Sequence, residues 1–176
     1  MPDNLKPAAP EKTAPRVVAL FLTEYIPGVK KEYALLEQAC DGPVKITLPH
    51  LQMETLIFAL HCLDRAIFAF WGAEYRAVFM DYAFSTACEV LYSAFPEPAK
   101  ERLAESFERL CATRQREYTA LTPLVGKDVD SGNVLAYEFG EKMCFSAGVR
   151  NVDVIATMIS NAQSILIMML EIAEDL

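Results

Sequence analysis

The side chains best suited to chemistry in this sequence gather on the segment of residues 48–71. If that segment is helical, at about 100° per residue, a group of charged and titratable residues falls within an arc of roughly 60°, with Asp64 just off its edge. The group is His50, Glu54, His61 and Arg65. An imidazole can move a proton or bind a metal near neutral pH, and a guanidinium can clamp a carboxylate. This stripe therefore has the components of a polar site.

A second polar stripe lies on the segment of residues 73–95, which stops at a proline. Its members fall within about 40° of the helix circumference, and they are Glu74, Asp81, Ser85 and Tyr92. On one unbroken helix the two stripes would lie roughly 140° apart, and the polar face would change sides halfway along. A break at Gly72 is the simpler interpretation.

Folding the two segments into an antiparallel hairpin about Ala73 brings the stripes level with each other. Six residues then pair across the hairpin, and we call them the polar seam: Arg65 with Asp81, His61 with Ser85, and Glu54 with Tyr92. In this seam His61 would act as an acid, a base or a ligand, and Arg65 would clamp an anion. Asp81 would orient one of these two, and Glu54 would be an accessory acid.

Two other interpretations of the stripes stay open. Charged stripes on helices ordinarily face water, and the same groups could instead form a buried network that only stabilises the fold. His50 and Glu54, one helical turn apart, are weak candidates for metal ligands, but the sequence compels no third ligand. We therefore expect no metal and no cofactor.

The elements that must position these residues are all predicted to be helices. A helix either kinked or broken at Ile26-Pro27 is expected first, followed by a turn at Asp41-Gly42-Pro43. Residues 122–133 are an extended break, and Thr47 is the expected N-cap of the helix that carries the first stripe. The predicted fold is an all-α, single-domain antiparallel helical bundle of five to seven helices. Residues 1–15 are expected to be a disordered lead-in, and residues 16–176 the bundle domain.

Two helices near the C-terminus have informative compositions. Gly140 lies inside one of them, where glycine costs about 1 kcal/mol relative to alanine, so close approach of a neighbouring helix is the expected compensation. The last helix, which starts at Asn151, is apolar over well over half of its circumference. It is either a central rod, packed with the hairpin of residues 48–95, or a helix whose surplus apolar face forms a dimer interface.

Composition points to apolar surface beyond the needs of a small core. Hydrophobic residues make up 53% of the 176 residues, and the mean hydropathy is +0.18. Such a chain is expected to form a homo-oligomer, with a dimer favoured, or to enclose a pocket for an apolar small molecule.

Charge and cysteine usage exclude several classes of function. A formal net charge of −8 and a pI near 4.8 argue against nucleic-acid binding and against anionic membrane surfaces. The polar residues of the last helix argue against a membrane span. Five widely spaced cysteines without a C-x-x-C pair indicate reduced thiols, of which Cys88 is the one candidate for reactivity, and no signal-like segment is visible. We expect a cytoplasmic protein.

Two functional hypotheses follow. The first is a non-enzymatic cytoplasmic binding or regulatory protein that self-associates through apolar helix faces. The alternative is a small-molecule or metal site in the bundle core, open to enzymatic chemistry, built on the polar seam.

Overall fold

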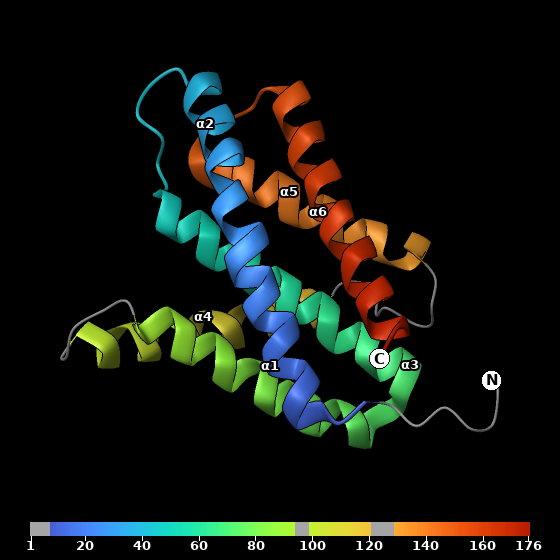
Figure 1. Ribbon diagram of the computed structural model, residues 1–176. Coiled ribbons are helices and arrows are strands. Elements are labelled where there is room, and N and C mark those ends of the chain that lie inside the picture. Colours follow the sequence, from blue (N-terminus) through green and yellow to red (C-terminus); the bar gives the residue numbers. More distant parts are fainter. Residues whose placement is uncertain (1–7, 94–98, 121–128) are drawn as a thin grey trace.

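The computed structural model describes residues 8–93, 99–120 and 129–176, and of residues 92, 93, 99–103 and 129–133 it describes the backbone only. These parts of the chain contain helices and no strand, which confirms the all-α fold (Figure 1). The elements are α1 (Pro10–Leu20), a π-helical turn (Phe21–Tyr25), a 3-10 turn (Ile26–Gly28), α2 (Val29–Ala39), α3 (Leu48–Ser93), α4 (Ala99–Ala120), α5 (Val129–Ala147) and α6 (Val152–Glu174).

The N-terminal helices form one rod that begins earlier than predicted. Helix α1 starts at Pro10, within the expected lead-in, because proline is well tolerated in a first helical turn and Ala14 is fully buried in the core. The helical path continues through the π-helical and 3-10 turns into α2, so the break considered at Pro27 is a change of helical pitch. In Figure 1 this rod lies across α3.

Helix α3 bends sharply at Gly72, as the two stripes predicted. Gly72 has φ 81° and ψ −179°, a conformation that side chains other than glycine rarely adopt. The helix begins at the predicted cap, where the His50 N–H donates to Thr47 Oγ1 over 3.3 Å. Figure 1 shows the two halves of α3 diverging from the bend as a V.

The bend is held by both ends of the described chain. The Trp71 indole N–H donates to the carbonyl of Ala173 over 2.7 Å, and the Tyr75 hydroxyl donates to the carbonyl of Ala8 over 2.7 Å. The Ala8 N–H in turn donates to Leu176 over 2.8 Å. These contacts fix both arms of the V at their junction.

The first half of α3 is the centre of the molecule. Every residue from Glu54 to Asp64 is buried, whereas the second half leaves one side exposed. Helix α6 packs on α5 and on α3. Its apolar side points inward, and the buried residues on it are Met158, Ala162, Ile165, Leu166, Met169, Leu170 and Ala173. The last helix and both arms of the hairpin therefore contribute to the core, the second arm through Phe79, Ala83 and Ala87.

One side of α6 is thus used inside the chain, whereas Val152 and Ile167 of the same helix are exposed. The dimer stays a prediction. Among the described residues, α3 and α6 are long and apolar enough to cross a membrane by length and composition alone. The relevant window of α3 is 61% buried, as in the core helix of a globular protein, and that of α6 is 28% buried.

Glycine at position 140 permits the close packing of α5 on α6. A Cβ at this position would lie 2.6 Å from the backbone nitrogen of Ile159 and 2.8 Å from its Cα. Backbone atoms cannot move aside as a flexible side chain can, so the close approach predicted from the sequence is confirmed.

We expect Gly140→Ala to lower the free energy of unfolding by about 1–3 kcal/mol, because the added methyl group overpacks the helix contact. Urea titration followed by circular dichroism measures this. Gly28→Ala is the matched control: Gly28 has a helical φ of −65° and nothing within 4 Å of the added Cβ, so stability should be unchanged or slightly higher. Equal effects of the two substitutions would contradict the close packing.

Candidate functional site

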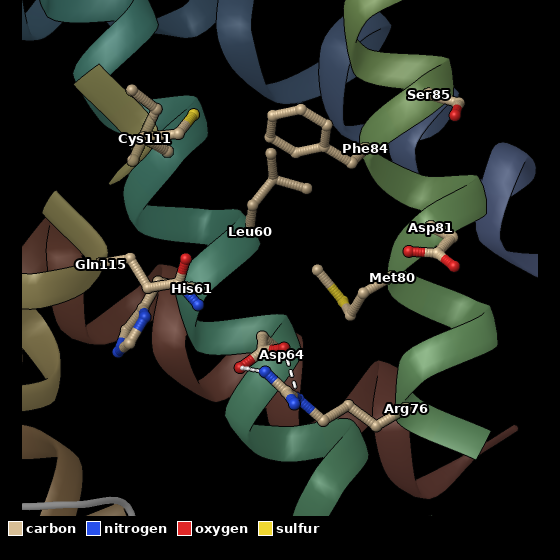
Figure 2. Close-up of a pocket in the computed structure, with 11 residues that line it drawn as sticks. Leu60, His61, Asp64, Arg76, Met80, Asp81, Phe84, Ser85, Cys111 and Gln115 are labelled. Atoms are coloured by element: carbon tan, nitrogen blue, oxygen red, sulfur yellow. Dashed lines mark hydrogen bonds and ion pairs between the residues drawn. The ribbon is translucent and has the colours of Figure 1, made fainter. Parts of the chain in front are cut away.

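A cavity of about 420 Å³ lies between the two arms of α3 and against α4. We call it the α3–α4 cavity. Leu60 projects into it from the first arm, and Met80 and Phe84 project from the second (Figure 2). The complete lining is Ile57, Leu60, His61, Asp64, Arg76, Met80, Asp81, Phe84, Ser85, Cys111 and Gln115.

An ion pair closes the cavity at its narrow end, near the bend. Arg76 donates through Nε to Asp64 Oδ1 over 2.6 Å and through its terminal nitrogen to Asp64 Oδ2 over 3.0 Å (Figure 2). Only 10% of the Asp64 side chain and 33% of the Arg76 side chain are exposed. The hydrogen bond to Asp64 raises the pKa of Arg76, so the guanidinium keeps its charge within the ion pair.

The predicted pairing of Arg65 with Asp81 is wrong. The Arg65 guanidinium lies over the ring of Phe68, 5.4 Å from its centroid, and Arg65 is not part of the cavity lining. The ion pair across the bend is instead made by Asp64 and Arg76. On the second arm, Arg76 lies nearer to Gly72 than Asp81 does, so the pairing is shifted toward the bend relative to a hairpin about Ala73. Arg76 was absent from the sequence-based candidates because it lies off the polar stripe of its own helix.

His61 lines the cavity and is buried, with 9% of its surface exposed. Its ring lies 5.1 Å from that of Tyr118, and Figure 2 shows it next to Gln115 on the α4 side. Burial lowers its pKa to about 4, against the opposing effect of Asp64, and Arg65 and Arg76 lower it further. His61 is therefore a neutral imidazole at pH 7, able to donate or accept one hydrogen bond at each nitrogen.

Asp81 and Ser85 line the same cavity and are exposed. Figure 2 places Asp81 across the cavity from His61 and Gln115, so Asp81 does not orient the imidazole. Within the described part of the chain, the Asp81 carboxylate has neither a hydrogen bond nor an ion pair. The Tyr92 side chain, the last member of the polar seam, lies outside the described side chains.

Cys111 is the thiol nearest to this site, rather than Cys88, which the sequence had singled out. Burial raises the pKa of Cys111 to about 12, and the neighbouring Cys88 and Glu54 raise it too. A thiol of this kind stays protonated and is a poor nucleophile.

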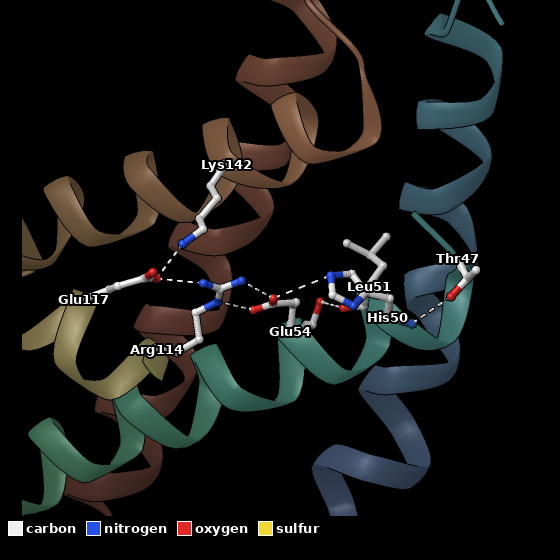
Figure 3. Close-up of polar contacts among 8 residues, drawn as sticks. Thr47, His50, Leu51, Glu54, Arg114, Glu117 and Lys142 are labelled. Carbon is white, nitrogen blue, oxygen red and sulfur yellow. Dashed lines mark hydrogen bonds and ion pairs between the residues drawn. The ribbon is translucent and has the colours of Figure 1, made fainter. Parts of the chain in front are cut away.

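Glu54 belongs to a separate, buried ion-pair network that joins three helices (Figure 3). Its side chain is fully buried, and both of its oxygens accept hydrogen bonds from Arg114 of α4, with Nε 2.7 Å from Oε2. Arg114 also donates to Glu117 over 2.8 Å, and Lys142 of α5 pairs with the same Glu117 oxygen. Glu54 thus holds α4 on α3, and both of its oxygens are engaged there rather than free as an accessory acid. The predicted pairing of Glu54 with Tyr92 falls outside the described side chains.

The charged surface of α4 concealed this role of Arg114. The sequence of α4 alternates charges as a solvent-facing helix does, and nothing in its spacing separates Arg114 from the other basic residues. The hydrogen bonds to Glu54 raise the pKa of Arg114, although burial opposes this. Only 13% of the Arg114 side chain is exposed.

The weak metal candidates, His50 and Glu54, do lie together, with His50 Nε2 3.6 Å from Glu54 Oε1. Both Glu54 oxygens are engaged by Arg114, however, and no cluster of three or more potential ligands occurs among the residues that the structure describes. His50 therefore lies beside the Glu54–Arg114 pair and forms no metal site with it.

Comparison with known proteins finds no match to this chain, either among protein-family models, among curated proteins or among solved structures.

We expect Arg114→Met to lower the free energy of unfolding by about 3–5 kcal/mol, because it leaves a buried carboxylate unpaired. The double variant Glu54→Leu/Arg114→Met should recover most of this loss. Lys142→Met is the control, since its contact with the half-exposed Glu117 is worth at most about 1 kcal/mol. Urea unfolding measures all three, and equal losses in Arg114→Met and Lys142→Met would contradict the structural role of the pair.

We expect His61 to make the fold less stable in mild acid. Its folded pKa of about 4 lies below the ordinary value of 6.5, so the unfolded chain takes up the proton first as the pH falls. His61 should account for about 2 kcal/mol of lost stability between pH 7.5 and pH 5, and His61→Gln should remove that part of the pH dependence. His50→Gln is the control. Identical pH profiles for wild type and His61→Gln would show that His61 titrates normally.

Proposed function

We propose that this chain is a non-enzymatic, cytoplasmic binding protein that holds a small molecule in the α3–α4 cavity. The observation that supports this best is the cavity itself: its volume of about 420 Å³ is within the range that small-molecule sites occupy. Apolar side chains from both arms of α3 project into it, and polar groups that can form hydrogen bonds, among them His61 and Gln115, also line it.

The chemistry of the lining favours binding over catalysis. Cys111 is a protonated thiol, and His61 is a weak base with a pKa near 4, whereas the Ser85 hydroxyl lies on the opposite arm of α3 (Figure 2). The Arg76 guanidinium is already paired with Asp64. These groups are suited to hydrogen bonding and shape recognition of a ligand.

The cavity is also supported by a rigid frame. One wall is the buried arm of α3, one is the half-exposed arm beyond Gly72, and α4 contributes Cys111 and Gln115. The Glu54–Arg114 pair fixes α4, and the Asp64–Arg76 pair fixes the narrow end. A site held open in this way loses little entropy when a ligand binds.

We expect a neutral apolar fluorophore, N-phenyl-1-naphthylamine, to bind the full-length chain with an increase in fluorescence. Met80→Trp should weaken this binding at least about tenfold, because the larger indole would fill the space that Leu60 and Met80 border from opposite arms. Fluorescence titration gives the dissociation constants, and circular dichroism shows whether each variant is folded.

Ile167→Trp is the matched control for that experiment. Ile167 is 41% exposed on α6 and is not part of the cavity lining, so this variant should bind the fluorophore as wild type does. Equal binding by a folded Met80→Trp variant would locate the fluorophore elsewhere and overturn the proposal. Native mass spectrometry of the purified chain would identify any molecule that it carries from the cell.

A further inference from the structure

The arrangement of charges around the α3–α4 cavity indicates the kind of molecule that it selects. We propose that the ligand is a cationic amphiphile, that is, an apolar body bearing a protonated amine, with the ammonium group held at Asp81. This inference rests on the binding function proposed above and adds the chemical class of the ligand.

The first step is the charge balance of the lining. The Asp64 carboxylate and the Arg76 guanidinium are joined by two hydrogen bonds and neutralise each other. His61 is neutral, because burial disfavours its protonated form. One charged lining group then remains without a partner in the described part of the chain, the carboxylate of Asp81. The cavity therefore has one uncompensated negative charge.

The second step concerns an aromatic ring that lines the cavity from the same arm as that carboxylate. Phe84 follows Asp81 by three residues on the same arm of α3, so both side chains are on one face of the helix, and both line the cavity. An aromatic ring attracts a cation over its face, in addition to the attraction of the carboxylate. Phe84 itself stacks on Phe107, with centroids 5.6 Å apart, which keeps the ring in place.

The third step is the position of the apolar body. Leu60 and Met80 approach each other from opposite arms, and Asp81 lies next to Met80 (Figure 2). A ligand whose amine meets Asp81 would therefore extend its apolar part between these two side chains. His61 and Gln115, on the far side, could receive a hydrogen-bonding group at the other end of the ligand.

An anionic ligand fits this lining poorly. It would face the Asp81 carboxylate, and Arg76, the one cationic group among the described lining residues, already donates two hydrogen bonds to Asp64. The net charge of the chain, −8, adds a repulsive field for anions and an attractive one for cations. A neutral ligand would use the apolar walls and leave Asp81 solvated.

Three dansyl probes of matched length test this on the full chain: dansylcadaverine, which has a terminal ammonium, N-pentyl dansylamide, which is neutral, and N-dansyl-6-aminohexanoic acid, which has a carboxylate. At pH 7 and low salt we expect dansylcadaverine to bind about five- to tenfold more tightly than the neutral probe, and the carboxylate probe to bind most weakly. The preference should shrink as salt is added.

Two variants test whether Asp81 is the source of the preference for dansylcadaverine. Asp81→Asn should reduce the affinity for dansylcadaverine to that of the neutral probe and leave the neutral probe unaffected. Glu89→Gln removes the same charge from an exposed position two turns along α3, outside the lining, and should preserve the preference. A loss of equal size in both variants would show a general field effect and overturn the assignment to Asp81.

The outcomes also separate this inference from the proposed function. If the neutral probe binds wild type and is lost in folded Met80→Trp, but dansylcadaverine shows no preference, the cavity binds small molecules and the cationic class is wrong. Tightest binding of the carboxylate probe would also overturn it, in favour of recognition by Arg76. If no probe responds to Met80→Trp, the cavity is not the binding site and both proposals fail.

Discussion

The structure depends on a buried pair of opposite charges. Glu54 lies in the most enclosed stretch of the chain, where an unpaired carboxylate would cost several kcal/mol of stability, so the fold must bring Arg114 to it. That requirement sets the position of α4 on α3 more strictly than apolar contacts could, because a bidentate pair has one geometry and apolar contacts tolerate many. Because this pair holds α4 on α3, α4 forms one wall of the cavity.

Gly72 supplies the other constraint. A helix with the composition of α3 would continue straight through this point with any residue that prefers a negative φ, and the two arms would then never enclose a space. The bend turns one long helix into two walls, and the Asp64–Arg76 pair sets how far the walls separate. The cavity therefore depends on Gly72 and on the Asp64–Arg76 and Glu54–Arg114 pairs, which set the positions of its walls. Its apolar side chains line the space between those walls.

Features set by local sequence could be predicted, and features set by the crossing of distant helices could not. Gly72, the Thr47 cap and the close approach at Gly140 follow from conformational rules that operate within a few residues. The polar seam placed His61, Asp81 and Ser85 on facing arms, and all three line one cavity. The true partners, Arg76 and Arg114, depend on how far apart the arms lie and on where α4 crosses α3, which periodicity does not report. Of the interpretations left open for the first stripe, a solvent-facing position does not hold for Glu54 and His61 for the same reason: other helices cover them.

The two ion pairs differ in how much chain separates their members, and this difference has a kinetic consequence. Asp64 and Arg76 are 12 residues apart, whereas Glu54 and Arg114 are 60 residues apart. Closing a short loop costs less chain entropy and takes less time than closing a long one. We expect the V of α3 to be among the first nonlocal structures in the refolding chain, and α4 to dock later onto an arm already in place. The cavity would then be completed near the end of folding, as its last wall arrives.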